Sequence, residues 1–272
     1  MRIVVPIKQV PETNAVRMDE QTGTMIREGV EAIVNPLDLY AIELAIRLRE
    51  SHGGEVIAVS MGPPKAAKAL KEAIAMGADS GALITDKAFA GSDTWATSYV
   101  LAAAVRKLGG AGFQPVDLII CGERATDGDT GQVGPGIASF LDLPALTYVS
   151  KVEEISDGRI RVRRLVEDGY ELLESELPCV LTVVKEIAAP RLPTLRGKQK
   201  AKATELTRWG PDDLEVDRGR VGLNGSPTRV VRIFRPKVTR QCEKLTAGDE
   251  HAVGEAAERL VEFLRQRSLL RT

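Results

Sequence analysis

The sequence predicts an α/β protein whose sheet is mainly parallel and doubly wound, with an antiparallel extension and a C-terminal arm. Up to about Leu143, short β-branched runs alternate with longer helical patterns, which is typical of a parallel sheet covered by helices. A glycine-rich polar loop, Gly122 to Pro135, separates one such run from the next helical pattern. From Thr147 apolar and polar residues alternate, and this change of period predicts antiparallel strands.

The first half of the chain supplies the parallel sheet. Each of its first three helical patterns follows a recognisable start signal: Asn35-Pro36, Pro63-Pro64 and Ser92-Asp93. Right-handed crossovers would bring the carboxyl ends of the strands to one edge, where ligands collect in such sheets. The predicted strands are Ile3 to Ile7, Glu55 to Ser60, Gly81 to Thr85 and Val116 to Cys121, and the predicted helices are Leu37 to Ser51, Pro64 to Met76, Thr94 to Lys107 and Ile137 to Leu143.

The second half begins with four alternating runs, which predict an antiparallel meander. Asp157-Gly158 and Asp168-Gly169 are strong short hairpin signals between three of them. The runs are Val152 to Ile155, Ile160 to Leu165, Glu171 to Glu174 and Cys179 to Val184.

Beyond Glu186 the pattern weakens. Ala189 to Leu195 is a Pro-interrupted apolar loop, and Arg196 to Lys202 is basic and contains a glycine. Asp212 to Val216 predicts a short helix or turn, Ser226 to Pro236 an extended arm, and Asp249 to Gln266 an amphipathic helix. An arm and helix outside the main alternation are expected to lie on a partner.

The loop from Gly122 to Pro135 is the strongest candidate for a binding site. A helix N-terminus presents unpaired N–H groups with a partial positive charge, and glycines let the backbone approach an anion, so a phosphate is expected. The loop lacks a Gly-Lys-Ser/Thr ending and carries Asp127 and Asp129, which we expect to cap N–H groups or hold ribose hydroxyls. The alternative is an ordinary connection in which Asp, Thr and Gly serve only as turn and cap residues.

Composition argues against several classes of partner. The 37 basic and 38 acidic residues give a net charge of −1, so nothing global attracts nucleic acid or anionic membranes. Only 4% of the residues are aromatic, which gives no stacking platform for bases. Met1 leads directly into a strand, and no apolar stretch approaches membrane-spanning length, so no membrane insertion is expected.

The cysteines and histidines predict neither disulfides nor a metal site. Cys121, Cys179 and Cys242 are scattered, and an odd count argues for reduced thiols in a cytoplasmic protein. His52 and His251 lie far from any cysteine pair. Cys121 ends a strand beside the candidate loop and could be reactive, although a buried, inert thiol is the favoured interpretation.

Several segments together resemble the β subunit of the electron-transfer flavoproteins. Val162 to Leu173, followed by Pro178 to Thr182, is similar to that family's signature. Four other segments agree with it: Ile7 to Pro11, Val34 to Asp38, Ser60 to Pro63, and Gly122 to Pro135. The resemblance implies an α/β domain of the adenine-nucleotide-binding type, which pairs with a larger α subunit that carries the electron-carrying FAD.

The resemblance also implies the ligand of the β subunit. In plain electron carriers of the family the β site holds AMP as a structural ligand, whereas in electron-bifurcating members it holds a second FAD that takes hydride from NADH. Carried over by position, the nucleotide contacts fall on Pro6, Asn35, Pro36, Leu37, Asp38, Met61, Gly122, Arg124, Ala125, Thr126, Asp127, Gly128, Asp129, Thr130, Gly131, Gln132 and Val133.

Two segments resemble the bifurcating and nitrogen-fixation-associated branch. They are Asp127 to Pro135 and Phe89 to Thr94. This resemblance implies FAD, with AMP as the alternative, and Gly128 and Gly131 would leave room for a diphosphate. It also implies NADH contact at Phe89, Ala90, Gly91, Ser92 and Asp93, a segment that could equally be an ordinary loop with a helix cap.

Leu195 matches the family's recognition loop, in which an exposed leucine anchors a dehydrogenase. The alternative is a small buried core under a Pro-rich loop. The implied partners are the α subunit in a heterodimer, an acyl-CoA dehydrogenase or quinone reductase, and ferredoxin or flavodoxin as a low-potential acceptor. The chain is then divided into a nucleotide-binding domain with the meander (1–190), a partner-recognition loop (191–206), and an arm and helix that pack on the α subunit (207–272).

Overall fold

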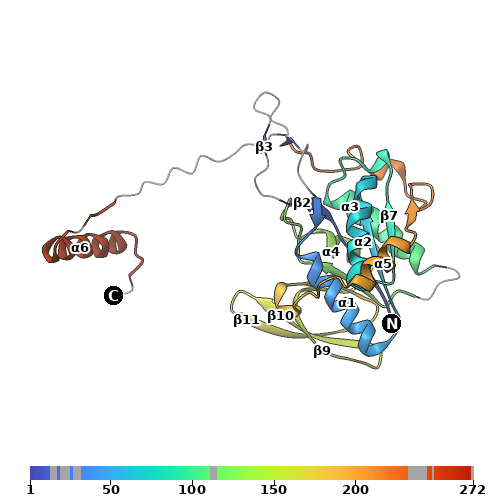
Figure 1. Ribbon diagram of the computed structural model, residues 1–272, viewed down its shortest axis with the longest axis horizontal. Helices are drawn as coiled ribbons and strands as arrows, with labels where there is room; N and C mark the ends of the chain where they lie inside the picture. The colour runs from blue at the N-terminus through green and yellow to red at the C-terminus, as the bar shows by residue number, and fades with distance from the viewer. Residues whose placement is uncertain are drawn as a thin grey trace. The chain divides into compact units, whose positions relative to one another are not determined.

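The computed structural model describes residues 1–12, 17–18, 25–26, 32–110, 115–231, 244–246 and 248–270 (Figure 1). Residues 1–232 form one compact unit and residues 233–272 form another. In the second unit, helix α6 (Glu250–Gln266) begins after Asp249, whose carboxylate accepts a hydrogen bond from the N–H of Ala252 at 2.8 Å. The predicted terminal helix is therefore confirmed. Cys242 and residues 232–236 of the predicted arm lie outside the described residues.

In the described part of the first unit, nine strands form one sheet. Their order is β11-β10-β9-β12-β8-β1-β6-β7-β13, and all pairings from β9 to β13 in that order are parallel. The strands are β1 (Arg2–Pro6), β6 (Glu55–Met61), β7 (Ser80–Ile84), β8 (Leu118–Gly122), β9 (Ala145–Ser156), β10 (Arg159–Val166), β11 (Gly169–Glu176), β12 (Cys179–Val183) and β13 (Thr207–Trp209). Two short antiparallel pairs stand apart from this sheet: β2 (Gln9–Pro11) with β5 (Ala32–Val34), and β3 (Arg17–Met18) with β4 (Met25–Ile26).

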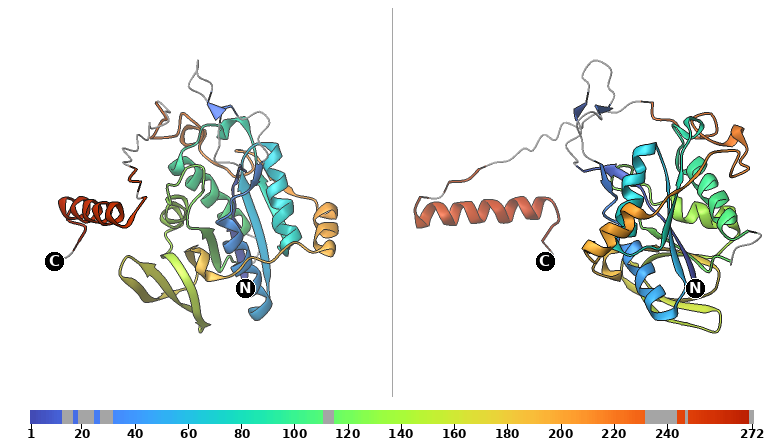
Figure 2. Two further views of the ribbon diagram at one scale, coloured as in Figure 1. Left: turned by 60° about the vertical axis from the view of Figure 1, so that its left-hand side comes forward. Right: turned by 45° about the vertical axis from the view of Figure 1, so that its right-hand side comes forward.

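Helices cover both faces of the parallel strands. The left view of Figure 2 shows α1 and α2, blue and cyan, on one side of the strands and the green α3 and α4 on the other. Helix α5 packs along α2. The helices are α1 (Asp38–His52), α2 (Ala67–Met76), α3 (Thr94–Leu108), α4 (Val133–Leu141) and α5 (Leu195–Ala203), with single 3₁₀ turns η1 (Pro64–Ala66), η2 (Lys87–Phe89), η3 (Lys185–Ile187) and η4 (Arg218–Arg220).

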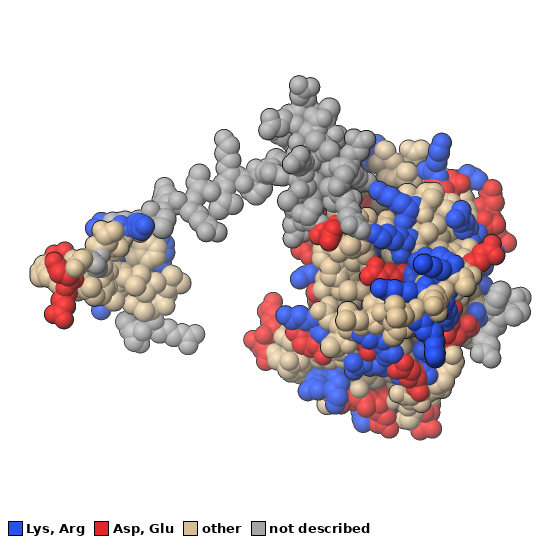
Figure 3. Space-filling view, viewed as in Figure 1, with Lys and Arg blue, Asp and Glu red and all other residues tan. Residues whose placement is uncertain are grey.

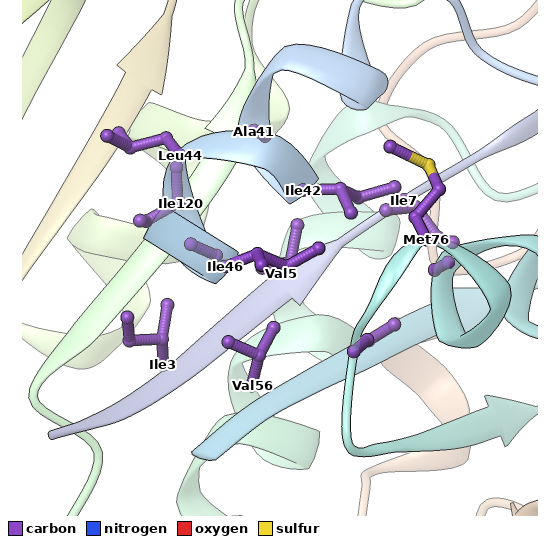
Figure 4. Packing of buried hydrophobic residues seen from close by; sticks show 14 of the residues in the cluster. Ile3, Val5, Ile7, Ala41, Ile42, Leu44, Ile46, Val56, Met76 and Ile120 are labelled. Carbon is purple, nitrogen blue, oxygen red and sulfur yellow. The ribbon is translucent and has the colours of Figure 1, made fainter. Parts of the chain in front are cut away.

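The central strand β1 divides two apolar cores. Its alternate residues Ile3 and Val5 belong to the core beneath α1 and α2, whereas Val4 belongs to the core beneath α3 and α4. Figure 4 shows Ile42 and Ile46 of α1 among the side chains packed over β1. Full burial of an aliphatic side chain contributes about 1.5–3 kcal/mol, so these layers hold the helices on the sheet.

The strand order creates a switch point between β1 and β8. The chain leaves β1 toward β6 on one side and returns later to β8 on the other. At such a point the two following connections diverge to opposite faces and leave a crevice at the carboxyl ends of the strands. The connections after β1 and β8 are therefore the part of the fold best placed to hold a ligand.

The predicted fold class is confirmed, with corrections in three segments. The prediction was wrong for Cys179 to Val184, because β12 is a parallel strand between β9 and β8 and not the fourth strand of a meander. Its burial along the whole strand is typical of parallel strands covered on both faces. Arg196 to Lys202, predicted without regular structure, belongs to helix α5, and α4 starts at Val133 rather than Ile137.

Two further elements differ in detail. The second hairpin turn is Glu167-Asp168, with Gly169 already in β11 opposite Val166. Strand β13 was not predicted, since three residues carry no usable period. Asp212 to Val216 is a turn for most of its length, and Asp93 caps α3 through a 3.0 Å hydrogen bond from the N–H of Ala96, both as predicted.

Substitution of Gly134 by alanine should destabilise the protein. A Cβ at this position would lie 2.5 Å from Cγ2 of Thr182. Thr182 cannot move freely, since it is buried and its Oγ1 accepts a hydrogen bond from the N–H of Tyr148 at 3.0 Å. We expect Gly134→Ala to lower the free energy of unfolding by about 1–3 kcal/mol in a denaturant titration.

Gly128→Ala is the matched control, because a Cβ there would meet no atom within 4 Å. It should leave the free energy of unfolding nearly unchanged. Equal effects of the two substitutions would contradict the packing of α4 on β12.

Candidate functional site

The candidate site lies where the connections after β1 and β8 meet. Asn35, just before α1, is completely buried and joins both connections. Its Nδ2 donates to the carbonyl oxygen of Arg124 at 2.9 Å, and its Oδ1 accepts from the N–H of Thr126 at 3.1 Å. Its own N–H donates to the carbonyl of Lys8 at 2.8 Å. One amide side chain therefore fixes the loop after β8 against the segment after β1.

Asp38 lies beneath this contact and is 6% exposed. Its carboxylate accepts hydrogen bonds from the N–H of Lys8 at 2.7 Å and from Nδ2 of Asn35 at 2.8 Å. Burial raises the pKa of Asp38 to about 7, although these two hydrogen bonds act in the opposite direction. Gly122 completes the packing, because a Cβ there would lie 2.5 Å from Oδ1 of Asp38. Asp38 and Gly122 thus support the site from below.

Two ion pairs offset the charges of the two aspartates of the loop. Nζ of Lys8 lies 2.7 Å from Asp127, and Nε of Arg124 lies 2.9 Å from Asp129. The predicted cap of the loop N–H groups is supplied by Asn35 rather than by either aspartate. These contacts lessen the repulsion that the two aspartates would exert on a phosphate group.

The loop then turns into α4. Asp129 and Gly131 have positive φ, 54° and 63°, so the backbone bends sharply just before the helix. The first N–H groups of an α-helix have no partner within the helix, and they are available to a phosphate at this end. Oε1 of Gln132 accepts a hydrogen bond from Oγ1 of Thr94 at 2.8 Å, which ties the start of α4 to the start of α3.

The segment proposed for NADH, Phe89 to Asp93, lies at the same edge of the sheet, after β7. Phe89 is buried, whereas Ala90 and Gly91 are exposed. Residues 222–228 hold this segment in place: the N–H of Leu223 donates to the carbonyl of Ala90 at 3.0 Å, and the N–H of Asp93 donates to Oγ of Ser226 at 2.8 Å. Ser92 accepts from the N–H of Gly222 at 3.0 Å. The exposed part of the segment is therefore limited to Ala90 and Gly91, because Ser92 and Asp93 make hydrogen bonds to residues 222–228.

The other residues carried over by position flank this centre. Pro6 is buried at the end of β1, and Met61 is partly buried at the end of β6. Pro36 is exposed and Leu37 is partly buried at the start of α1, whereas Thr130 is exposed in the loop. Ala125 accepts loop hydrogen bonds from Gly128 and Asp129.

Two residues at the site were not among the predicted contacts, although the segment that begins with Lys8 was expected at the ligand edge of the sheet. Lys8 follows β1, but only its ion pair with Asp127 identifies it, and no spacing rule links residues 119 positions apart. Tyr148 has a positive φ of 56°, which is rare for a bulky residue, and its hydroxyl lies 3.8 Å from the Cβ position of Gly131. Its position in a continuous strand pattern gave no signal of this conformation.

Leu195, the predicted partner contact, is the first residue of α5 and is 82% exposed. The alternative of a buried core under the loop is therefore wrong for this side chain. Leu192 nearby is 86% exposed. Both leucines lie at or just before the start of α5, so they are separate from the candidate nucleotide loop after β8.

The described cysteines are structural. Cys121 and Cys179 are buried and unpaired, and burial raises the pKa of both thiols, for Cys179 to about 12. Among the residues with described positions, no group of three or more His, Cys, Asp or Glu side chains could hold a metal ion. Within the same residues, none of the helices combines the length and the apolar character needed to cross a membrane.

Comparison with known proteins decides the family. Residues 22–214 match the electron transfer flavoprotein domain. The chain is 49% identical over 271 residues to the electron transfer flavoprotein subunit beta of Thermoanaerobacterium thermosaccharolyticum, covering 99% of this chain and all of that one. The chain belongs to the electron transfer flavoprotein family. Two other relatives are the caffeyl-CoA reductase-Etf complex subunit CarD of Acetobacterium woodii (45% identity; 99% of this chain, 100% of that one) and protein FixA of Azorhizobium caulinodans (42%; 99% and 96%).

The chain is a β subunit of this family, as its resemblance to the signature predicts. Electron transfer flavoprotein β subunits work with an α subunit and with electron-transfer partners. The site between β1 and β8 is therefore the candidate nucleotide site of an electron transfer flavoprotein β subunit.

Buried Asp38 should make the stability of this β subunit depend on pH. Because its pKa of about 7 lies above the ordinary value of 3.8, the folded state binds the proton more tightly than the unfolded state. The free energy of unfolding should therefore fall as pH rises from about 4 to about 7, by up to about 4 kcal/mol, and should level off above that range. Denaturant titrations at several pH values measure this slope.

Asp38→Asn removes the titrating group and should flatten the curve in this window. The groups facing Asp38 include Lys8, Asp127 and Cys121, and all three remain in the variant. Identical pH curves for the two proteins would contradict the assignment.

Proposed function

We propose that this β subunit binds FAD at the site between β1 and β8 and, in a heterodimer with its α subunit, oxidises NADH. Electrons then divide between a low-potential carrier, ferredoxin or flavodoxin, and the FAD of the α subunit, which serves a dehydrogenase. The observation that carries the proposal is the loop after β8. It is fixed by Asn35, its carboxylates are paired with Lys8 and Arg124, and it ends at the N-terminus of α4.

The residues at the site fit the diphosphate of an adenine-containing coenzyme. The N–H groups at the start of α4 would bind its phosphate oxygens. A Cβ at Gly128 would meet nothing within 4 Å, so the loop has open space on its outer side. Flavin, when bound, supplies the hydride and single-electron chemistry, and the protein supplies position and electrostatics.

The similarity of Asp127 to Pro135 and of Phe89 to Thr94 to the bifurcating branch favours FAD over AMP. We propose that NADH approaches at Ala90 and Gly91, the exposed part of the segment after β7. The hydrogen bond between Thr94 and Gln132 supports this placement, since it links the end of that segment to the start of α4. The second candidate function is a plain electron carrier in which AMP occupies the site as a structural ligand.

Two further surfaces are proposed to bind partners. Helix α6 carries exposed Val253, Leu260 and Phe263, and we propose that it packs on the α subunit as the end of the C-terminal arm. Leu195 is proposed to enter an apolar pocket of an acyl-CoA dehydrogenase or quinone reductase. Its high exposure supports this role, because a large apolar side chain that is nearly fully exposed gains free energy when a partner covers it.

Counting flavins tests the proposed function. The heterodimer, purified with its α subunit, should release two flavins and no AMP on denaturation, and NADH should bleach part of its flavin absorbance under anaerobic conditions. One flavin and one AMP per heterodimer, with no reduction by NADH, would reject bifurcation and establish the carrier function.

Leu195→Ala should weaken docking without affecting the nucleotide site, from which it is separate in the fold. We expect electron transfer to the dehydrogenase to slow by about tenfold at limiting partner, since a truncated anchor costs about 1–3 kcal/mol of an interface. Flavin content should be unchanged, and this provides the control. Transfer rates equal to wild type would discard the anchor.

A further inference from the structure

An almost completely buried carboxylate on α1 has no role in the nucleotide site. Glu43 is 1% exposed and lies on the face of α1 that meets the segment before α5. A buried charge is strongly unfavourable unless it is paired and hydrogen-bonded. Its partners therefore show what it holds.

The main partner of Glu43 is Arg191. Oε2 of Glu43 accepts from Nε of Arg191 at 2.8 Å and from the N–H of Arg191 at 3.1 Å. The same guanidinium donates to both carboxylate oxygens of Glu50, two turns further along α1, at 2.6 and 2.9 Å. A planar guanidinium bonded in this way is fixed in direction as well as position.

The ionisation of these groups agrees with this geometry. Burial would raise the pKa of Glu43, but hydrogen bonds from Arg191 and Arg47 outweigh it and hold that pKa below its ordinary value. Hydrogen bonds to Glu50 and Glu43 raise the pKa of Arg191 above its ordinary value. The network is therefore charged and intact near neutral pH.

Helix α5, which follows Arg191, is held just as closely by α2. Thr194 caps it, accepting from the N–H of Gly197 at 2.9 Å. A Cβ at Gly197 would lie 2.1 Å from the carbonyl oxygen of Ala75, so α5 can approach the end of α2 only with glycine there. Lys71 of α2 donates to the carbonyls of Ala201 and Thr204 at the other end of α5.

This firmly held segment exposes the most accessible leucines of the first unit's described residues. Leu192 follows Arg191 directly and is 86% exposed, and Leu195 begins α5 and is 82% exposed. Residues 190–203 contain five Lys and Arg and no Asp or Glu. Figure 3 shows Lys and Arg side chains gathered over α2 and α5. The adjoining groove of about 910 Å³ has three cations in its lining, Lys71, Lys202 and Arg208, against one carboxylate, Glu205.

We infer that Arg191, gripped by Glu43 and Glu50, fixes Leu192 and Leu195 as a pair of anchors and so pre-organises the docking element, residues 190–203, to which the proposed function already assigns partner binding. The occupant of this element is an electron-transfer protein with an apolar pocket rimmed by acidic side chains. The identity of the partner rests on the proposed function. The clamp, by which we mean the hydrogen bonds of Arg191 to Glu43 and Glu50, does not depend on it. A loop ordered before binding loses less conformational entropy when it docks, so the clamp strengthens association without touching the partner.

Amide hydrogen exchange in the heterodimer tests the clamp without any partner. Arg191→Met should speed exchange at Gly197 and Lys198, whose N–H groups donate to Thr194 at the start of α5, by about tenfold or more, with the sheet unchanged. Arg191→Lys keeps the charge but loses the planar fork, and exchange should still rise by about threefold or more. Wild-type exchange rates in both variants would overturn the inference.

Arg196→Met is the matched control. It removes an exposed cation of the same element, and exchange should stay at the wild-type rate. If Arg196→Met and Arg191→Met speed exchange equally, the effect belongs to charge in general, and the specific clamp is refuted.

Electron transfer to a purified acyl-CoA dehydrogenase tests the docking. Arg191→Met and Leu192→Ala should each raise the KM for this protein about five- to tenfold, with little change in kcat. Arg196→Met should raise the KM at low salt only, through lost electrostatic steering, whereas the defect of Arg191→Met should persist at high salt, because screening removes steering but does not restore position. A salt-dependent defect in Arg191→Met would assign it to steering and overturn the positioning role.

The two failures can be told apart. If Leu192→Ala and Leu195→Ala both transfer electrons normally while exchange still depends on Arg191, the clamp stands and docking of a dehydrogenase at this element is wrong. If the leucines matter but Arg191 affects neither exchange nor KM, the docking surface stands and its pre-organisation is wrong.

Discussion

Asn35 and Asp38 join three segments that the parallel sheet by itself would leave apart. At the switch point, the connections after β1 and β8 go to opposite faces, so no shared helix or strand holds them together. The buried amide of Asn35 bridges the two backbones, and the buried carboxylate of Asp38 holds both that amide and the N–H of Lys8. Each buried polar group of Asn35 and Asp38 needs a hydrogen-bond partner, since an unpaired one lowers the free energy of unfolding by about 1–3 kcal/mol. The shape of the nucleotide loop depends on this arrangement.

The protein treats charge in opposite ways on two of its surfaces. At the nucleotide loop the carboxylates are paired: Asp127 with Lys8, and both Asp129 and Glu123 with Arg124. Around α5, Arg191 and Lys200 are paired with acidic residues of other segments, whereas the exposed Arg196, Lys198 and Lys202 make no ion pair with the described residues. Balanced charge suits a site in which geometry selects a compact ligand, whereas unbalanced charge suits long-range attraction of a protein partner. The net charge of the whole chain is −1, so it does not indicate this difference between the two surfaces.

Rigid support is common to both surfaces. In each case a buried side chain on α1 or just before it binds a segment distant in sequence: Asn35 holds the loop after β8, and Glu43 holds the segment before α5. Helix α1 is itself fixed on β1 by the apolar core, so the nucleotide loop and the docking element share one scaffold within the first unit. Under the proposed function, this shared scaffold would hold the coenzyme site and the docking element at a fixed distance within the β subunit.

The sequence by itself determined the elements whose signals are local. The apolar periods gave the strands β1, β6, β7 and β8, the start signals gave α2 and α3, and the glycine-rich run marked the candidate loop. Tertiary structure decided what depends on distant partners. Strand β12 is parallel because it fits between β8 and β9, and a period of two cannot tell which neighbour a strand will have. Asn35 lies 89 residues from Arg124, and Glu43 lies 148 from Arg191. Sequence spacing could not predict either of these two contacts, because a buried polar group meets its partner only when the chain has folded.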